Sequence, residues 1–167
     1  MKADPELLIE IKETSVGKGL FAKEAIPAAT VLFQVAINTR KLKFGDTKKL
    51  EGRESHALQI SIDEYVLLQP PVLYSNHSCV PNCGFDEEYQ FITVRDISKG
   101  EELVWDYSTS MFEHNWTMKC QCGTELCRTI VRDFDLLPQE IQAKYLNMKI
   151  VLPYIVDILK TRYAKTD

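Results

Sequence analysis

Two short stretches of this chain gather the residue types that bind metals or attack substrates. Residues 74–83 read YSNHSCVPNC and hold one of the three histidines and two of the five cysteines. Residues 120–127 form a C-x-C-x4-C pattern. Three thiolates at this spacing can bind one Zn²⁺, which takes four soft or borderline ligands in a tetrahedron. We therefore expect a metal site whose fourth ligand comes from the first stretch, with Cys79, Cys83 and His77 as the candidates.

Other roles for these residues are weaker. A cysteine nucleophile needs a low thiol pKa and a base within reach. His77 and Cys79 are two residues apart, and an extended chain gives such a pair little freedom to reach that geometry. The stretch also resembles a capped polar turn, because Asn, Ser and Pro are common turn formers. Residues 120–127 could instead carry three free thiols, but C-x-C followed by Gly suits a metal knuckle.

The composition fits one soluble domain with an ordinary core. The chain has 167 residues, of which 45% are hydrophobic and 26% charged. A net charge of −4 argues against nonspecific duplex binding and suits a basic peptide partner. No apolar run is long enough for a membrane span, and the acidic start does not resemble a secretory signal. Five cysteines without such a signal indicate a reducing, intracellular compartment, cytoplasmic or nuclear.

Hydrophobic periodicity predicts the elements that position these residues. Alternating or short apolar runs predict strands at residues 7–12, 19–24, 29–35, 65–68 and 89–94. Residues 15–19 predict a tight glycine-rich turn, and residues 40–59 predict a surface insertion or loops. Beyond Pro138 the apolar residues recur at helical spacing, and the pattern resumes after Pro153. The chain is therefore expected to be a β-rich α+β protein.

Four motifs together resemble those of the SET-domain protein lysine methyltransferases. Residues 76–82, NHSCVPN, resemble the family's NHSCxPN motif, and residues 100–107, GEELVWDY, resemble its GEELTxDY motif. Residues 17–22, GKGLFA, are similar to its N-terminal GxGLFA turn. The C-x-C-x4-C pattern followed by Arg128 resembles its post-SET zinc knuckle. The motifs occur in the family's order and cover roughly residues 7–130.

The resemblance implies an architecture that periodicity does not predict. The family fold has small curled β-sheets around a pseudoknot, in which the segment carrying Tyr107 passes beneath a loop near residues 76–79. On this basis we expect a SET domain at residues 7–112, a post-SET zinc segment at 113–132 and a helical extension at 133–167 packed on the domain. The assembly is expected to be a monomer or a homodimer.

The resemblance also implies an activity. Family members transfer a methyl group from S-adenosylmethionine to a lysine side chain, with donor and lysine entering a narrow channel from opposite faces. The implied substrate is a lysine in a histone tail or another protein, and the implied zinc is structural. The alternative is a catalytically inactive module that keeps the zinc-stapled fold to bind a peptide.

Site residues follow from motif position. Tyr107 is the implied catalytic residue. The implied donor-binding residues are Lys18, Gly19, Leu20, Asn76, His77, Tyr107, Phe112 and Trp116. The implied lysine channel contains Tyr74, Phe85 and Trp105. The implied zinc ligands are Cys79, Cys120, Cys122 and Cys127, which leaves Cys83 packed as a small apolar residue.

Three features of this set stay open or depart from the family. Phe112 and Trp116 have an alternative role in packing the post-SET segment. Trp105 stands where Phe or Tyr is commoner in the family, which leaves the number of methyl groups added open. Tyr74 and Ser75 stand where the family often has a pair such as Arg-Phe.

Overall fold

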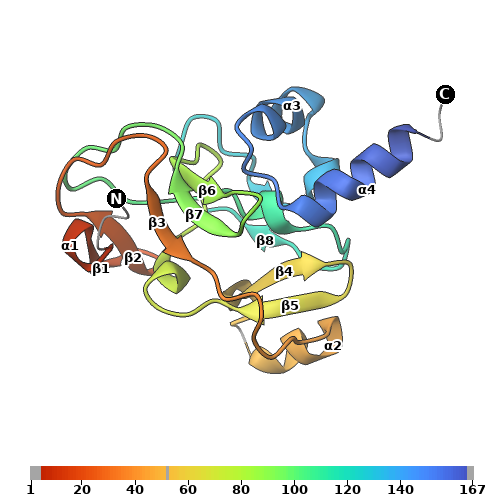
Figure 1. The fold of residues 1–167 in the computed structure, drawn as a ribbon. Helices are drawn as coiled ribbons and strands as arrows, with labels where there is room; N and C mark the ends of the chain where they lie inside the picture. Colours follow the sequence, from red (N-terminus) through yellow and green to blue (C-terminus); the bar gives the residue numbers. More distant parts are fainter. Residues whose placement is uncertain (1–4, 52, 165–167) are drawn as a thin grey trace.

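The computed structural model describes residues 5–51 and 53–164 (Figure 1). Residue 52 of the expected SET domain and residues 165–167 of the expected extension lie outside the described residues. Within the described part the strands form small antiparallel sheets, and the longest helices lie near the C-terminus. The expected β-rich α+β class is confirmed.

Short strands pair locally or across the chain. The two-stranded sheets are β1 (Ile9–Thr14) with β2 (Gly17–Ala22), β4 (Ala57–Ser61) with β5 (Glu64–Leu67), and β8 (Met118–Lys119) with β9 (Ile130–Val131). The three-stranded sheet has the order β3 (Val31–Gln34), β7 (Gln90–Thr93), β6 (Cys83–Phe85). Each pair is antiparallel, so each sheet can cover a core with one face.

Helical segments are short except at the C-terminal end. The α-helices are α1 (Pro5–Leu8), α2 (Phe44–Thr47), α3 (Gln139–Asn147) and α4 (Pro153–Tyr163). The 3-10 turns are Lys48–Leu50, Glu54–His56, Val72–Tyr74, Tyr107–Ser110 and Phe134–Leu136. Pro153 starts α4, where its missing N–H has no helical partner to lose. The predicted C-terminal helices are confirmed.

Two local predictions need correction. The strand predicted at 7–12 starts at Ile9, because residues 5–8 form a helical turn. The glycine-rich turn predicted at 15–19 is shorter than expected: Gly17 has φ 110, but Lys18 and Gly19 continue as part of β2. At Gly19 a Cβ would lie 2.6 Å from Oε1 of Glu102, so this glycine permits close packing inside a strand.

Two clusters of buried apolar side chains hold the fold together. The main core lies among the sheets and includes Leu20, Phe85, Phe91 and Leu103, all fully buried. The second core is built largely by the C-terminal segment and consists of Phe112, Phe134, Leu137, Tyr145, Ile150, Val151, Ile155 and Leu159. Full burial of such a side chain stabilises the folded state by about 1.5–3 kcal/mol.

The C-terminal segment also reaches the main core. Leu152 belongs to the main core, and its backbone N–H donates to the carbonyl of Thr109 over 3.0 Å. The side chain of Ile150 would lie 2.6 Å from a Cβ placed on Gly84 of β6. The segment between α3 and α4 is therefore packed directly on the sheet.

Backbone hydrogen bonds bring two of the sequence motifs together. His77 and Trp105 form a parallel bridge. The amide of Trp105 donates to the carbonyl of Asn76 over 3.1 Å, and the amide of Ser78 donates to the carbonyl of Trp105 over 3.0 Å. The loop before β6 therefore lies beside the segment that leads to Tyr107, where the family's pseudoknot is expected.

Candidate active site and cysteine cluster

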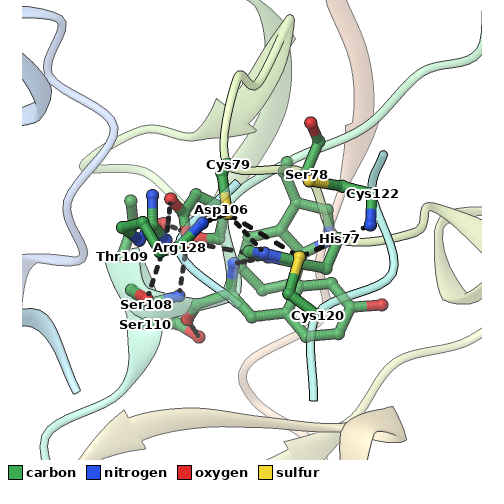
Figure 2. Close-up of polar contacts among 12 residues, drawn as sticks. His77, Ser78, Cys79, Asp106, Ser108, Thr109, Ser110, Cys120, Cys122 and Arg128 are labelled. Carbon is green, nitrogen blue, oxygen red and sulfur yellow. Dashed lines mark hydrogen bonds and ion pairs between the residues drawn. The ribbon is translucent and has the colours of Figure 1, made fainter. Parts of the chain in front are cut away.

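Four cysteines meet at one point in the structure. The Sγ atoms of Cys79, Cys120, Cys122 and Cys127 all lie within 4.8 Å of one another, and two of them, in Cys79 and Cys120, are 3.7 Å apart. Figure 2 shows Cys79 beside Cys120 and Cys122. Three of the thiols come from the connection between β8 and β9, and one comes from the loop before β6. The cluster could bind a metal ion, and its donor set suits zinc.

The surroundings of the thiols shift their pKa values in both directions: burial raises the pKa of Cys79 and of Cys120, whereas the pKa of Cys122 is lowered. Backbone amides donate to three of the sulfurs: Arg128 to Cys79 at 3.3 Å, Cys122 to Cys120 at 3.4 Å, and Thr129 to Cys127 at 3.4 Å. Burial disfavours the thiolate of Cys122, but hydrogen bonds led by the Thr124 hydroxyl outweigh it and lower the pKa to about 6. Amide donors to sulfur are an outer shell that metal-bound thiolates commonly have.

The fifth cysteine lies elsewhere. Cys83 is fully buried in the main core, and burial raises the pKa of its thiol. It packs as a small apolar side chain, as expected for the cysteine left over from the cluster.

His77 lies between the cluster and Tyr107. Its Nδ1 accepts a hydrogen bond from the Tyr107 amide at 3.2 Å, and its Nε2 lies 3.5 Å from Sγ of Cys79. Because Nδ1 accepts, the proton of the neutral ring resides on Nε2. Burial is the main reason that the pKa of His77 is lowered to about 4, against the opposing effect of Asp106. The imidazole is therefore neutral and directed toward the cysteine cluster.

A buried carboxylate ties the same region to the C-terminal helices. Asp106 is fully buried and accepts a hydrogen bond from Nη2 of Arg128 at 2.6 Å (Figure 2). It also accepts a hydrogen bond from the Tyr145 hydroxyl of α3 at 2.9 Å. It also caps the 3-10 turn that begins at Tyr107, by accepting from the Ser108 amide at 3.1 Å. A buried charge needs such partners to offset its lost hydration. The backbone at Tyr107 is fixed by this set of contacts.

Two cavities flank Tyr107. Cavity A, of about 560 Å³, is lined among others by Asn76, His77, Glu102 and Cys122. Cavity B, of about 330 Å³, is lined among others by Tyr65, Trp105, Glu113 and Trp116. Tyr107 and Ser55 line both cavities. These two residues therefore mark the place where the cavities adjoin.

The Tyr107 side chain is held at this junction. Its hydroxyl donates to the carbonyl of Ser75 over 3.2 Å, and Nε1 of Trp105 donates to the same carbonyl over 3.2 Å. The rings of Tyr107 and Trp105 are 4.7 Å apart. Burial raises the pKa of the Tyr107 hydroxyl, and the charge of Glu102 adds to the rise. The hydroxyl thus stays protonated at neutral pH and can donate.

The glycine motif lies next to cavity A rather than in its lining. The side-chain Nδ2 of Asn76 donates to the carbonyl of Lys18 at 3.1 Å and to Oε1 of Glu102 at 2.8 Å. The carbonyl of Leu20, a fully buried residue, accepts from the Leu103 amide at 2.7 Å. Thr14 at the end of β1 and residues 15–16 of the β1–β2 turn are among those that line cavity A, whereas residues 18–20 are not.

The remaining candidate residues are dispersed. Phe85 is fully buried behind Trp105, with ring centroids 4.8 Å apart. Tyr74 lies in a 3-10 turn, with Nζ of Lys18 5.3 Å from its ring centroid. Phe112 packs in the second core, and Trp116 lines cavity B. Of these four, Trp116 alone lines cavity A or B.

Sequence reasoning did not identify two of the lining residues. Ser55 and Glu113 lie in stretches without a recognisable pattern, so no signal in the sequence could have selected them. Ser55 also lies more than twenty residues before the nearest of the motifs that it adjoins, whereas Glu113 follows Tyr107 by six residues. Among the described helices, none has the length and apolar character that a membrane span requires.

Comparisons with known proteins agree with this geometry. The family described as SET domain matches residues 17–108. Histone-lysine N-methyltransferase 2D from Homo sapiens is 42% identical over 65 residues, which are 35% of this chain and 1% of that protein. A histone-lysine N-methyltransferase described as H3 lysine-36 specific, from Cryptococcus neoformans, is 27% identical over 126 residues, covering 66% of this chain and 15% of its own. The chain thus spans a small part of either relative.

The matched region contains the β1–β2 glycine motif, the NHSC loop and the segment ending at Tyr107. It spans more than half of the 167 residues. The small antiparallel sheets, the juxtaposition of the two central motifs and the cysteine cluster agree with this match. The chain belongs to the SET-domain family.

Proposed function

We propose that the chain is an S-adenosylmethionine-dependent protein lysine N-methyltransferase. The observation that carries the proposal is that Tyr107 lines two cavities that adjoin beside it. A methyl transfer needs its donor and its acceptor to meet in line at one point, and alignment of this kind can supply about 7–11 kcal/mol of barrier reduction. The proposed reaction takes place at this junction.

Cavity A is the proposed donor site. Its volume of about 560 Å³ lies in the range of ordinary small-molecule pockets. The Asn76 side chain, fixed by Lys18 and Glu102, and the carboxylate of Glu102 present polar groups there. A negative carboxylate complements a cationic donor. Bound there, S-adenosylmethionine would supply an activated methyl group on a sulfonium.

Cavity B is the proposed lysine channel. Aromatic side chains line much of it, including Tyr65, Trp105 and Trp116. A free lysine has a pKa near 10.4, so its neutral, nucleophilic form is scarce at neutral pH. An apolar channel excludes water and lowers that pKa. The protonated hydroxyl of Tyr107 would then orient the neutral amine at the junction.

The cysteine cluster is the proposed structural zinc site. Four thiols in a compact group with amide donors to three sulfurs suit a closed tetrahedral site. Residues 118, 119, 121, 122 and 124 of the cysteine-bearing segment line cavity A. A metal at the cluster would therefore hold one wall of the proposed donor site in place.

The proposed acceptor is a lysine in a histone tail or in another protein. Histone methylation is what the names of the relatives describe. The net charge of −4 also suits a basic peptide. The implied split into a SET domain at 7–112, a post-SET segment at 113–132 and a helical extension remains our proposal for the organisation of the chain.

The test combines donor binding with methyl transfer. Zinc-loaded protein is titrated with S-adenosylmethionine by calorimetry, and methyl transfer to a lysine peptide array is followed by mass. Tyr107→Phe is expected to lower transfer by at least about 10²-fold, the scale of a lost catalytic hydroxyl, and to leave donor affinity nearly unchanged. The control is Tyr89→Phe, because Tyr89 also donates a partly buried hydroxyl to a carbonyl but lines neither cavity.

The outcomes separate the two hypotheses. Absence of donor binding with and without peptide would reject the enzyme and favour the inactive peptide-binding module. Full activity of Tyr107→Phe would remove Tyr107 from the mechanism.

A further inference from the structure

Cavity B continues outward into a third depression. Cavity C, of about 410 Å³, shares four lining residues with cavity B: Phe44, Tyr65, Glu113 and Asn115. Cavities A and B share Tyr107 and Ser55 instead. The three cavities therefore adjoin in the order A, B, C, and Glu113 lies at the end of cavity B that is shared with cavity C.

The loop that carries Glu113 is fixed in place. The amides of Glu113 and His114 both donate to Oδ1 of the buried Asp133, over 2.6 Å and 3.1 Å. The Glu113 side chain accepts a hydrogen bond from the Tyr65 hydroxyl of β5. A carboxylate anchored by both its backbone and its side chain has a defined position at the cavity wall.

The neighbouring basic side chains contact other groups. His114 and Arg162 both pair with Asp135, at 2.9 Å and 3.1 Å. Nζ of Lys48 lies 4.5 Å from the centre of the Phe44 ring. Burial, with the nearby charge of Asp133, raises the pKa of Glu113 to about 7, while Lys48 acts in the opposite direction. A cation arriving from outside would stabilise the ionised carboxylate.

We propose that Glu113 selects substrates with a basic residue, arginine or lysine, beside the target lysine. The proposal rests on the function proposed above. Glu113 suits a flanking residue better than the target amine, because it lines the part of cavity B shared with cavity C, whereas Tyr107 and Ser55 mark the A–B junction. A carboxylate beside the target amine would favour the ammonium form, which cannot accept a methyl group. At the outer end it can form a charge-assisted hydrogen bond without that penalty.

The test is a defined peptide series with labelled methyl donor. Each peptide contains one lysine and carries arginine, glutamine or glutamate at each of the two positions before and after it. The wild-type protein is expected to methylate the best arginine-flanked peptide at least about tenfold more efficiently than its glutamine counterpart, the scale of one charge-assisted contact. Glu113→Gln is expected to reduce this ratio to below about threefold while still accepting the Tyr65 hydrogen bond.

Two further variants sharpen the result. Glu113→Lys should reverse the preference toward glutamate-flanked peptides, which a purely structural role would not produce. Glu88→Gln removes the same charge from an exposed side chain outside the three cavities and should keep the wild-type ratio.

Three results overturn the proposal. If the wild-type enzyme transfers methyl groups without preferring a basic flank, the role proposed for Glu113 is contradicted and the proposed function still stands. An unchanged preference in Glu113→Gln has the same consequence. Absence of transfer from the wild type to every peptide contradicts the proposed function, and the inference falls with it.

Discussion

Arg128 donates from Nη2 to Oδ2 of Asp106 over 2.6 Å, in a contact where the Asp106 side chain is fully buried and that of Arg128 is 15% exposed. In the sequence, Arg128 follows the last clustered cysteine and Asp106 precedes Tyr107. One ion pair thus joins the cysteine cluster to the proposed catalytic segment. The Tyr145 hydroxyl of α3 shares the same carboxylate oxygen.

Arg128→Met is therefore expected to destabilise the protein strongly. Removing one partner leaves the Asp106 charge buried with fewer donors, and such losses amount to roughly 3–5 kcal/mol. Urea denaturation of the zinc-loaded protein measures the free energy of unfolding. The matched control is Lys41→Met, which removes the exposed pair of Lys41 with Glu64 and should cost less than about 1 kcal/mol. Equal losses in the two variants would contradict a structural role for the buried pair.

We expect about one zinc per chain, bound by the four clustered cysteines. Cys122→Ser should lower the metal content and weaken binding of S-adenosylmethionine, because Cys122 belongs both to the cluster and to the lining of cavity A. Cys83→Ala is the control, since Cys83 lies in the main core. Elemental analysis of protein purified without chelator gives the stoichiometry. Metal-free protein, or normal metal content in Cys122→Ser, would refute the assignment.

Ser55→Leu is expected to separate donor binding from transfer. Ser55 lines both cavities with Tyr107, so a larger side chain there should narrow the passage between them. Because small misplacements at a reacting centre can cost about 10²-fold in rate, transfer should fall at least tenfold. Donor affinity by calorimetry should change little. Ser98→Leu is the control, because it places the same side chain at an exposed turn outside the cavities and should leave both quantities unchanged. Normal transfer in Ser55→Leu would indicate that the donor and the lysine meet at a different place.

Glu101 should make part of the stability dependent on pH. A hydrogen bond from Arg95 is the main reason that the pKa of Glu101 falls from 4.5 to about 2, and the Ser98 amide and Asn82 side chain add to it. Because the folded pKa is depressed, this contribution is present above about pH 4.5 and is lost as the pH falls toward 2.

Glu101→Gln should consequently lower the free energy of unfolding at pH 7 by roughly 1–2 kcal/mol, allowing for the exposure of Arg95. At pH 2 the variant and the wild type should converge. Denaturation curves across this range measure the difference, and comparing the two proteins cancels the protonation of other groups. If the difference in free energy of unfolding between the two proteins stays the same at all pH values, Glu101 makes no such contribution.

Local sequence patterns predict the strands and helices better than the contacts between them. The alternation at residues 89–94 predicted β7, and the helical spacing beyond Pro138 predicted α3, because both signals depend on neighbouring residues. Lys18 is predicted in a turn but lies in β2 beside Gly19, where the nearby Glu102 carboxylate makes a glycine necessary. Such contacts depend on a segment that is about eighty residues away in the chain.

The residues of the candidate site are likewise predicted from the sequence only in part. Its cysteines carry a spacing that is visible in the sequence, and the structure brings the four together with Cys79 as the fourth member. Ser55 and Glu113 are recognisable as site residues only from the cavities that they line, since their neighbours there come from separate segments of the chain. The tautomer of His77 likewise depends on the Tyr107 amide thirty residues away.

The contact between Ile150 and Gly84 bears on how the protein folds while it is being synthesised. Ile150 fills the space beside a glycine of β6, and Leu152 completes the main core, although the SET match ends at residue 108. A nascent chain that has emerged only to residue 108 therefore still lacks side chains that close its sheet. During synthesis, the apolar face near Gly84 stays exposed to chaperones and to aggregation until the segment before α4 leaves the ribosome.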